Sequence, residues 1–241
     1  MNGVHMLGSY DEELDRLRSL LSQMAGLAER LLGDAVTALL ARDIELAQKA
    51  IAADAEIDRL EAEAEALAIE TIARRAPLAD DLRELVSAIK IANALERIGD
   101  NAKNIARRST VLIESDPVRQ VSVLPEMSNE ARHMLRDVLD ALIARDSARA
   151  IDVWLRDERI DQLYDSLFRE LLTHMMENPQ RIGVCTHLLF MAKNIERIGD
   201  QATNIAELAY YVIEGRPLRD ERPRADLTPY MVIGEDKDRT P

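Results

Sequence analysis

An eleven-residue block occurs twice in this chain, and the repeat constrains the fold more than any other feature of the sequence. The first copy, residues 96–106, reads ERIGDNAKNIA, and the second copy, residues 196–206, reads ERIGDQATNIA. The two copies differ only at positions 101/201 and 103/203. Because a block this close to identity rarely arises twice by chance, it indicates two copies of one structural unit.

The repeat extends upstream of this block. Residues 38–43 (ALLARD) match residues 141–146 (ALIARD), and the Asp, Ile, Asp and Leu of residues 54–60 recur in residues 157–163. These segments are separated by 103 positions, whereas the eleven-residue blocks are separated by 100. The second copy therefore lacks three residues between its two matching segments, most simply in a turn.

Apolar residues recur at spacings of three and four through six long stretches, which is the pattern of amphipathic helices. Aromatic residues make up only 3% of the 241 residues, while Ala, Leu, Ile, Glu and Arg dominate. The expected helices cover residues 14–40, 43–73, 80–114, 125–145, 147–177 and 181–214. Short connections favour antiparallel neighbours. We therefore predict an all-α protein of two pseudo-symmetric antiparallel three-helix bundles, with six long helices.

The predicted division of the chain follows from where the periodicity weakens. Two prolines interrupt residues 115–125, so the junction between the repeats is placed there. We predict a first repeat over residues 1–116, a second over residues 117–217 and a flexible C-terminal tail over residues 218–241, which is rich in proline and charge.

Charge and cysteine content restrict the partners and the compartment. A formal net charge of −13 would repel nucleic acid phosphates, so nucleic acid is excluded as the main partner. Asp and Glu instead favour hard cations. The single cysteine, Cys185, cannot form an internal disulfide and fits a reducing compartment. We find no leader segment and no apolar stretch near the ~18 residues of a membrane span, and we expect a cytoplasmic protein.

Acidic pairs at i,i+4 spacing occur twice in each repeat, and such a spacing places both side chains on one face of a helix. The first acidic cluster would contain Asp54, Asp58, Glu96 and Asp100, and the second acidic cluster Asp157, Asp161, Glu196 and Asp200, with Asn104 and Asn204 one turn further on. On a helical wheel, Asp100 lies about 180° from the apolar stripe of its helix. The acidic faces are therefore expected to point away from the core.

Two interpretations of these faces remain open at this stage. They are either solvated faces, since an exposed like-charge pair costs only about 0.2–0.5 kcal/mol, or clusters that adjacent helices assemble around multivalent cations. A buried di-iron centre normally needs two Glu-x-x-His motifs, and only Glu130–His133 has that spacing. No phosphate-binding glycine loop, nucleophile elbow or Cys/His cluster is present. Gly99 and Gly199, inside helices, indicate close approach of a neighbouring helix, an ion or a partner.

Over residues 10–217 the chain resembles the PhoU family, the phosphate-specific transport system accessory proteins of bacteria. The resemblance rests on DDLR at residues 80–83, LERIGD at residues 95–100, NIERIGD at residues 194–200 and NIAE at residues 204–207. It implies two three-helix bundles whose Glu/Asp-x-x-x-Asp motifs bind multinuclear metal clusters of iron, zinc, manganese or magnesium at the surface. The eight carboxylates of the two acidic clusters match these motifs, and Asn104 and Asn204 match them less directly.

The resemblance also implies a function without enzymatic activity. It predicts a negative regulator of phosphate uptake and of phosphate-starvation signalling, which links the ATPase subunit of the phosphate ABC transporter to a sensor histidine kinase. We further expect a homodimer that reaches the inner face of the membrane through its partners. The alternative is a metal-dependent hydrolase or oxidase that uses the same carboxylates, which would need an open coordination position beside a substrate pocket.

Overall fold

The structure is a computed structural model that describes residues 2–115 and 122–218, with side chains from Tyr10 onward. Within these residues the chain is helical and contains no strand, which confirms the predicted all-α class. The helices are α1 (Asn2–Ala41), α2 (Ile44–Arg75), α3 (Asp80–Ile113), α4 (Leu124–Ala144), α5 (Ser147–Glu177) and α6 (Ile182–Glu214), with a short 3-10 helix, η2 (Pro179–Arg181), before α6.

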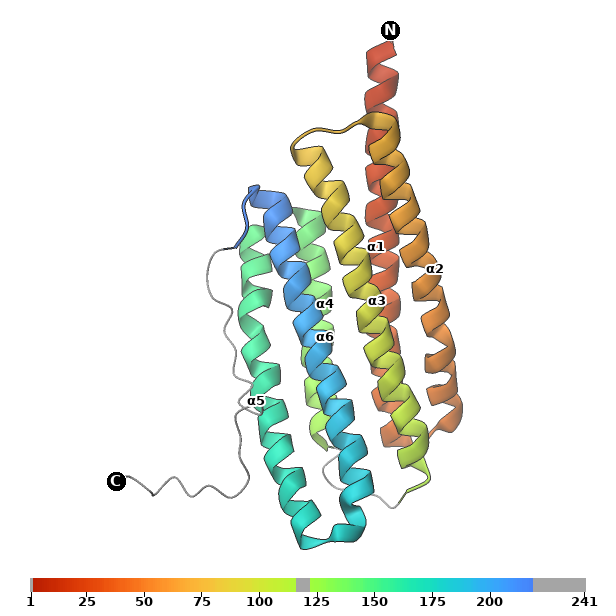
Figure 1. Cartoon of the computed structure of the whole chain (residues 1–241), viewed down its shortest axis with the longest axis vertical. Coiled ribbons are helices and arrows are strands. Elements are labelled where there is room, and N and C mark those ends of the chain that lie inside the picture. Colours follow the sequence, from red (N-terminus) through yellow and green to blue (C-terminus); the bar gives the residue numbers. More distant parts are fainter. Residues whose placement is uncertain (1, 116–121, 219–241) are drawn as a thin grey trace, which may run out of the picture.

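The helices form two antiparallel three-helix bundles, as predicted, and all six run roughly along the long axis of the molecule (Figure 1). Helices α1, α2 and α3 pack against one another in the first bundle, and α4, α5 and α6 form the second. The bundles meet where α3 packs on α6 and α1 packs on α4. Helices α2 and α5 therefore lie on the outer flanks, each covering one side of the helix that carries an eleven-residue block.

Equivalent polar caps begin the second helix of each bundle. The side chain of Asp43 accepts a hydrogen bond from the backbone N–H of Leu46, and Asp146 accepts one from Arg149, both at 3.0 Å. Such a cap stabilises a helix by about 1 kcal/mol, because it satisfies an amide that lacks a partner in the helix. Gly215, with φ of 73°, ends α6 in the left-handed conformation that glycine adopts readily.

Helix α1 is longer than predicted. It begins at Asn2, well before the expected start near residue 14, and extends beyond the end of the bundle (Figure 1). The prediction was wrong because it followed apolar periodicity, which marks only where a helix packs, whereas backbone hydrogen bonds can continue a helix further. The predicted junction includes residues 116–121 and the predicted tail includes residues 219–241, and both ranges lie outside the described residues.

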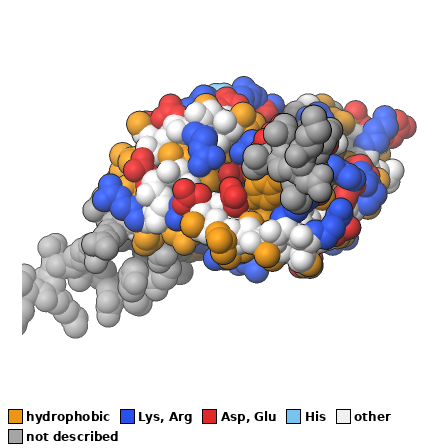
Figure 2. Space-filling model, turned by 90° about the horizontal axis from the view of Figure 1, so that it is seen from above, with side chains coloured by type: hydrophobic (Ala, Val, Ile, Leu, Met, Phe, Trp, Pro, Cys, Tyr) orange, Lys and Arg blue, Asp and Glu red, His pale blue; other side chains and the backbone are white. Residues whose placement is uncertain are grey.

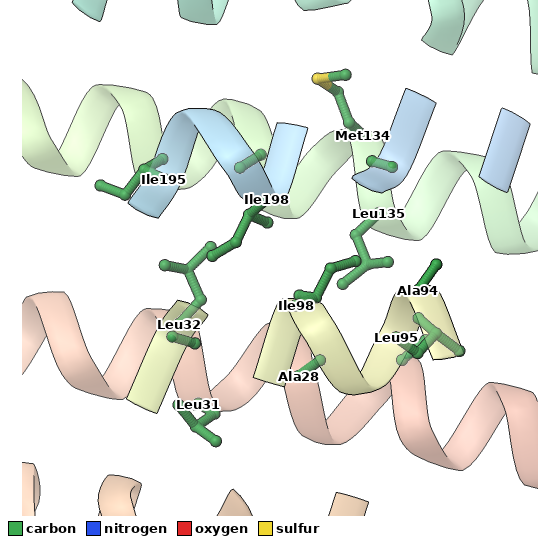
Figure 3. Packing of buried hydrophobic residues seen from close by; sticks show 14 of the residues in the cluster. Ala28, Leu31, Leu32, Ala94, Leu95, Ile98, Met134, Leu135, Ile195 and Ile198 are labelled. Carbon is green, nitrogen blue, oxygen red and sulfur yellow. The ribbon is translucent and has the colours of Figure 1, made fainter. Parts of the chain in front are cut away.

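The isoleucines of the repeated blocks lie in one continuous core. Ile98 of α3 and Ile198 of α6 are fully buried, and they meet side chains such as Leu32 of α1 and Leu135 of α4 (Figure 3). Burying an isoleucine contributes about 1.5–3 kcal/mol. Because these isoleucines fix the rotation of α3 and α6, the acidic residues of the same blocks are turned toward α2 and α5.

Charged side chains of both signs are interspersed on the end of the molecule shown in Figure 2, with hydrophobic side chains exposed between them.

Ion pairs connect α1 to its neighbours, including Arg18–Glu84 at 2.6 Å and Arg75–Glu13 at 3.1 Å. Each such pair contributes about 0–1 kcal/mol. Within the described residues, no helix combines the length and the apolar run that a membrane span needs.

Candidate metal centres

Gly99 and Gly199 are points where two helices approach closely. A Cβ atom added to Gly99 would lie 2.8 Å from Cδ1 of Ile57, and one added to Gly199 would lie 2.9 Å from Cδ1 of Ile160. Both distances are shorter than a normal carbon–carbon contact of about 3.5 Å. Of the explanations that the sequence left open, the structure therefore supports the close approach of a neighbouring helix at both glycines.

The same approach brings a buried aspartate against each glycine. Oδ1 of Asp54 would lie 3.1 Å from a Cβ on Gly99, and Oδ1 of Asp157 would lie 3.3 Å from a Cβ on Gly199. Both aspartates are only 2% exposed. The glycines thus allow a carboxylate of α2 to reach α3 and a carboxylate of α5 to reach α6.

The prediction that every acidic face points away from the core is wrong for half of the eight carboxylates. Four of them are buried: Asp54, Asp157, Asp161 and Glu196. Asp58 and Asp100 are exposed, as predicted, and Glu96 and Asp200 are partly exposed. Of the two asparagines, Asn104 is exposed and Asn204 is partly exposed. The reason is that a helix in a bundle touches neighbours on more than one side. A residue opposite the main apolar stripe can therefore face a second helix instead of water.

The first acidic cluster is brought together between α2 and α3. Burial, together with the negative charges of Asp100, Glu61, Asp58 and Asp54, raises the pKa of Glu96 to about 7. This shift requires these carboxylates to lie near Glu96. The four predicted carboxylates therefore lie near enough to influence Glu96, as does Glu61, which the sequence-based prediction did not include.

Lys103 lies within the first acidic cluster. Its Nζ atom is 2.5 Å from Oδ2 of Asp54 and 3.2 Å from Oδ1 of Asp100, so it bridges α2 and α3. The hydrogen bond to Asp54 raises the pKa of Lys103, while burial raises the pKa of Asp54 against the opposing effect of Lys103. The other carboxylate oxygen, Oδ1 of Asp54, is buried without a hydrogen-bond partner.

The second acidic cluster is centred on Glu196. The pKa of Glu196 is raised to about 7, mainly by burial and also by the negative charges of Asp200 and Asp161, while Lys193 acts in the opposite direction. Nζ of Lys193 lies 2.8 Å from Oε1 of Glu196, while Oε2 is buried without a hydrogen-bond partner. Carboxylates of α5 and α6 are thus brought together here, and Asp157 packs against the same stretch of α6 at Gly199.

Asp165 is a further buried carboxylate, which the sequence-based prediction did not include. It is 6% exposed and follows Asp161 by one helical turn, so Asp157, Asp161 and Asp165 form a row of buried aspartates along α5. The i,i+4 spacing could have identified Asp165, because it continues the pair already selected. Glu61 carried a weaker signal, since it follows Asp58 at i,i+3 on the same helix.

The donor atoms of both clusters suit a hard cation. Carboxylate oxygens are the ligands that magnesium and manganese prefer, and iron and zinc also accept them. The two buried oxygens without a partner, Oδ1 of Asp54 and Oε2 of Glu196, are sites where a ligand would offset an unfavourable desolvation. In the part of the chain that the structure describes, no three His, Cys, Asp or Glu side chains are arranged as a ready metal-binding group. Metal binding would therefore require side-chain movement.

The one Glu-x-x-His motif in the sequence, Glu130–His133, was the candidate for a di-iron centre. His133 is exposed, and Glu130 forms an ion pair with Arg156 at 3.9 Å. A di-iron centre of the bundle type would be built inside the core, and these two side chains lie outside it.

Because Glu196 prefers its neutral form in the folded protein, the metal-free protein should lose stability as the pH rises from about 4.5 to about 7. The unfolded chain ionises Glu196 near its ordinary pKa of 4.5, whereas the folded chain resists ionisation until about 7. We expect Glu196→Gln to stabilise the EDTA-treated protein by about 1–2 kcal/mol at pH 8 and to have little effect at pH 4.5. Urea denaturation of the wild-type and Glu196→Gln proteins at both pH values measures this difference. Equal free energies of unfolding of the two proteins at pH 8 would contradict the prediction.

Comparison with known proteins agrees with this architecture. The family model described as the PhoU domain matches residues 21–109 and 124–209, which contain both eleven-residue blocks and both acidic clusters. The chain belongs to the PhoU family. PhoU-domain matches thus cover most of each helical repeat.

Curated relatives extend over nearly the whole chain. The phosphate-specific transport system accessory protein PhoU homolog of Caulobacter vibrioides is 46% identical over 92% of this chain and 97% of its own length. The protein of the same name from Rhizobium meliloti is 47% identical over 95% of this chain and 97% of its own length.

Solved PhoU structures share the fold. PhoU from Pseudomonas aeruginosa is 36% identical with a TM-score of 0.83, and covers 86% of this chain and 100% of its own. The phosphate transport system regulatory protein PhoU from Streptococcus pneumoniae is 28% identical with a TM-score of 0.80, and covers 87% of this chain and 99% of its own.

Proposed function

We propose that this chain is a non-enzymatic negative regulator of phosphate uptake and of phosphate-starvation signalling. The observation that carries the proposal is the near-full-length similarity to proteins named phosphate-specific transport system accessory proteins, at 46–47% identity. Similarity that spans both repeats and both acidic clusters supports a shared role for the whole molecule and not for one bundle alone.

In this proposal, each acidic cluster holds metal ions. Asp54, Asp58, Glu96 and Asp100 would provide ligands between α2 and α3, and Asp157, Asp161, Glu196 and Asp200 would provide them between α5 and α6, with Asn104 and Asn204 as peripheral donors. A bound cation of iron, zinc, manganese or magnesium would supply positive charge that offsets the mutual repulsion of the carboxylates. The buried oxygens of Asp54 and Glu196 that lack partners support this role.

The regulator would act by binding its partners. It would connect the ATPase subunit of the phosphate transporter with a sensor histidine kinase at the inner face of the membrane, and it would form a homodimer. Asp58 and Asp100, the two exposed carboxylates of the first acidic cluster, can meet basic or metal-bridged partner surfaces.

We expect deletion of the gene to raise expression of phosphate-starvation genes in phosphate-rich medium, because the restraint on signalling would be lost. A reporter fused to such a promoter measures this effect, and reintroduction of the wild-type gene is the control. Normal repression in the deletion strain would contradict the proposal. Robust metal-dependent hydrolysis that disappears in Asp100→Ala would instead favour an enzyme that uses the same carboxylates.

A further inference from the structure

Helices α3 and α6 pack side by side in the middle of the molecule, with α2 and α5 on their outer flanks (Figure 1). We infer that the exposed strip along the boundary between α3 and α6 is a docking surface for an acidic helix of a partner protein. The inference rests on the proposed function and deepens it, because it names the chemistry of a partner that the regulator would bind.

Two contacts identify the edges at which α3 and α6 face each other. The guanidinium carbon of Arg83 in α3 lies 5.4 Å from the ring centre of Tyr211 in α6. The guanidinium carbon of Arg108 in α3 lies 4.3 Å from the ring centre of Phe190 in α6. The two arginines are near opposite ends of α3, so the boundary runs along most of both helices.

Further cations lie on the edges that these contacts define. Lys90 and Arg97 follow Arg83 at intervals of seven residues, about two helical turns, so they lie on the same edge of α3. Arg197 follows Phe190 by seven residues on α6. All three cations are exposed. The central strip is defined as Arg83, Lys90, Arg97 and Arg108 of α3 with Phe190, Arg197 and Tyr211 of α6.

Three exposed cations of the central strip have no carboxylate partner. Within the described residues, Lys90, Arg97 and Arg197 form no ion pair. Arg59, which is also exposed, pairs instead with two glutamates of its own helix. Although the chain has a formal net charge of −13, its acidic residues leave these cations uncompensated. A local positive strip of this kind attracts an acidic partner.

Arg108 is a partly buried cation at one end of the central strip. It donates a hydrogen bond of 3.4 Å to Nδ1 of His187 and stacks on Phe190, and in the part of the chain that the structure describes no carboxylate pairs with it. Burial lowers the pKa of Arg108, so a partner carboxylate would offset an unfavourable desolvation. Phe190 is 50% exposed and offers an apolar contact beside this cation. Arginine and aromatic side chains often contribute most of the binding energy of an interface.

The shape and surroundings of the central strip favour a helix over other anionic partners. From Arg83 to Arg108 the strip is about 38 Å long, which is too long for one small anion. The two acidic clusters lie on its flanks, toward α2 and α5, and would repel a broad anionic surface such as a lipid bilayer. A helix about 10 Å wide can rest along the boundary of two packed helices, whose axes are about 8–10 Å apart, without covering the flanks.

Fluorescence anisotropy of a labelled acidic peptide mixed with the full-length protein tests this inference. The probe is a helical peptide of about 25 residues with Glu along one face and Leu near both ends, and a peptide with Lys in place of Glu is its control. We expect Arg97→Gln combined with Arg197→Gln to weaken binding of the acidic peptide by about ten-fold or more. Phe190→Ala should weaken it by about three-fold or more. Higher salt should weaken binding by wild type.

The matched control combines Arg30→Gln with Arg169→Gln, which removes the same charge from exposed positions on α1 and α5 and should bind as wild type does. Circular dichroism checks the fold of each variant. No binding by wild type, or equal binding by the Arg97/Arg197 variant and wild type, would overturn this inference. The deletion phenotype of the proposed function is measured separately, so the two can fail independently.

Two further measurements address other occupants of the central strip. Binding of wild type to phosphatidylglycerol vesicles that the Arg97/Arg197 variant loses would assign the strip to a lipid surface and overturn the inference. A dimer in sedimentation velocity that dissociates in the same variant would assign the strip to a second copy of the chain, with the same consequence. We expect neither measurement to distinguish the variant from wild type.

Discussion

Replacement of Gly99 or Gly199 by valine is expected to destabilise the protein by about 3 kcal/mol. Even the first added carbon would lie 2.8 Å from Cδ1 of Ile57, or 2.9 Å from Cδ1 of Ile160, and both isoleucines are fully buried. The branched side chain of valine adds two further methyl groups to the same contact. Helices α2 and α3, or α5 and α6, would have to separate, and the free energy of unfolding in urea measures the loss.

Smaller changes at the same contacts separate crowding from helix propensity. Alanine favours a helix over glycine by about 1 kcal/mol, so Gly99→Ala should destabilise the protein less than Gly99→Val. Adding Ile57→Val to the Gly99→Ala protein should recover part of the loss, because valine lacks the crowded Cδ1 methyl. Gly26→Ala is the matched control, because its added Cβ would meet only the guanidinium of Arg30 at 3.7 Å. It should stabilise the protein by about 0.5–1 kcal/mol. Valine tolerated at position 99 without loss would contradict the close helix contact.

Lys103→Met is expected to destabilise the metal-free protein by about 2–3 kcal/mol. Methionine keeps an apolar stem of similar length but removes the ammonium group that pairs with Asp54, a carboxylate that is 2% exposed. Removing one partner of a fully buried ion pair typically destabilises a protein by about 3–5 kcal/mol. We expect a smaller loss here because the Lys103 side chain is partly exposed to solvent. Urea denaturation in the presence of EDTA gives the value.

A double-mutant cycle tests the cause of this loss. Asp54→Asn in the Lys103→Met background removes the charge that would be left unpaired, so the double variant should be more stable than Lys103→Met alone. Lys103→Arg keeps a cation at the site and should lose less than Lys103→Met. A double variant less stable than either single variant would show that Lys103 contributes through packing and not through its charge.

The sequence alone determined the features that depend on local spacing. Apolar periodicity predicted six helices. In the structure Asp43, Asp146 and Gly215 cap α2, α5 and α6, and each cap involves only residues within about one turn. The duplicated block predicted two equivalent bundles. The prediction that the acidic pairs bind metal stays a prediction.

Only the tertiary structure decided which acidic residues are buried and which cation each of them meets. Asp54 and Lys103 are 49 positions apart, and their contact depends on how closely α2 approaches α3 at Gly99. A helical wheel gives the direction of a side chain relative to its own helix but not the neighbours that surround that helix. The sequence therefore determined the two repeats and their carboxylates. The packing of one helix against the next decided how the two acidic clusters differ. The reason is that burial and ion pairing depend on contacts between distant parts of the chain.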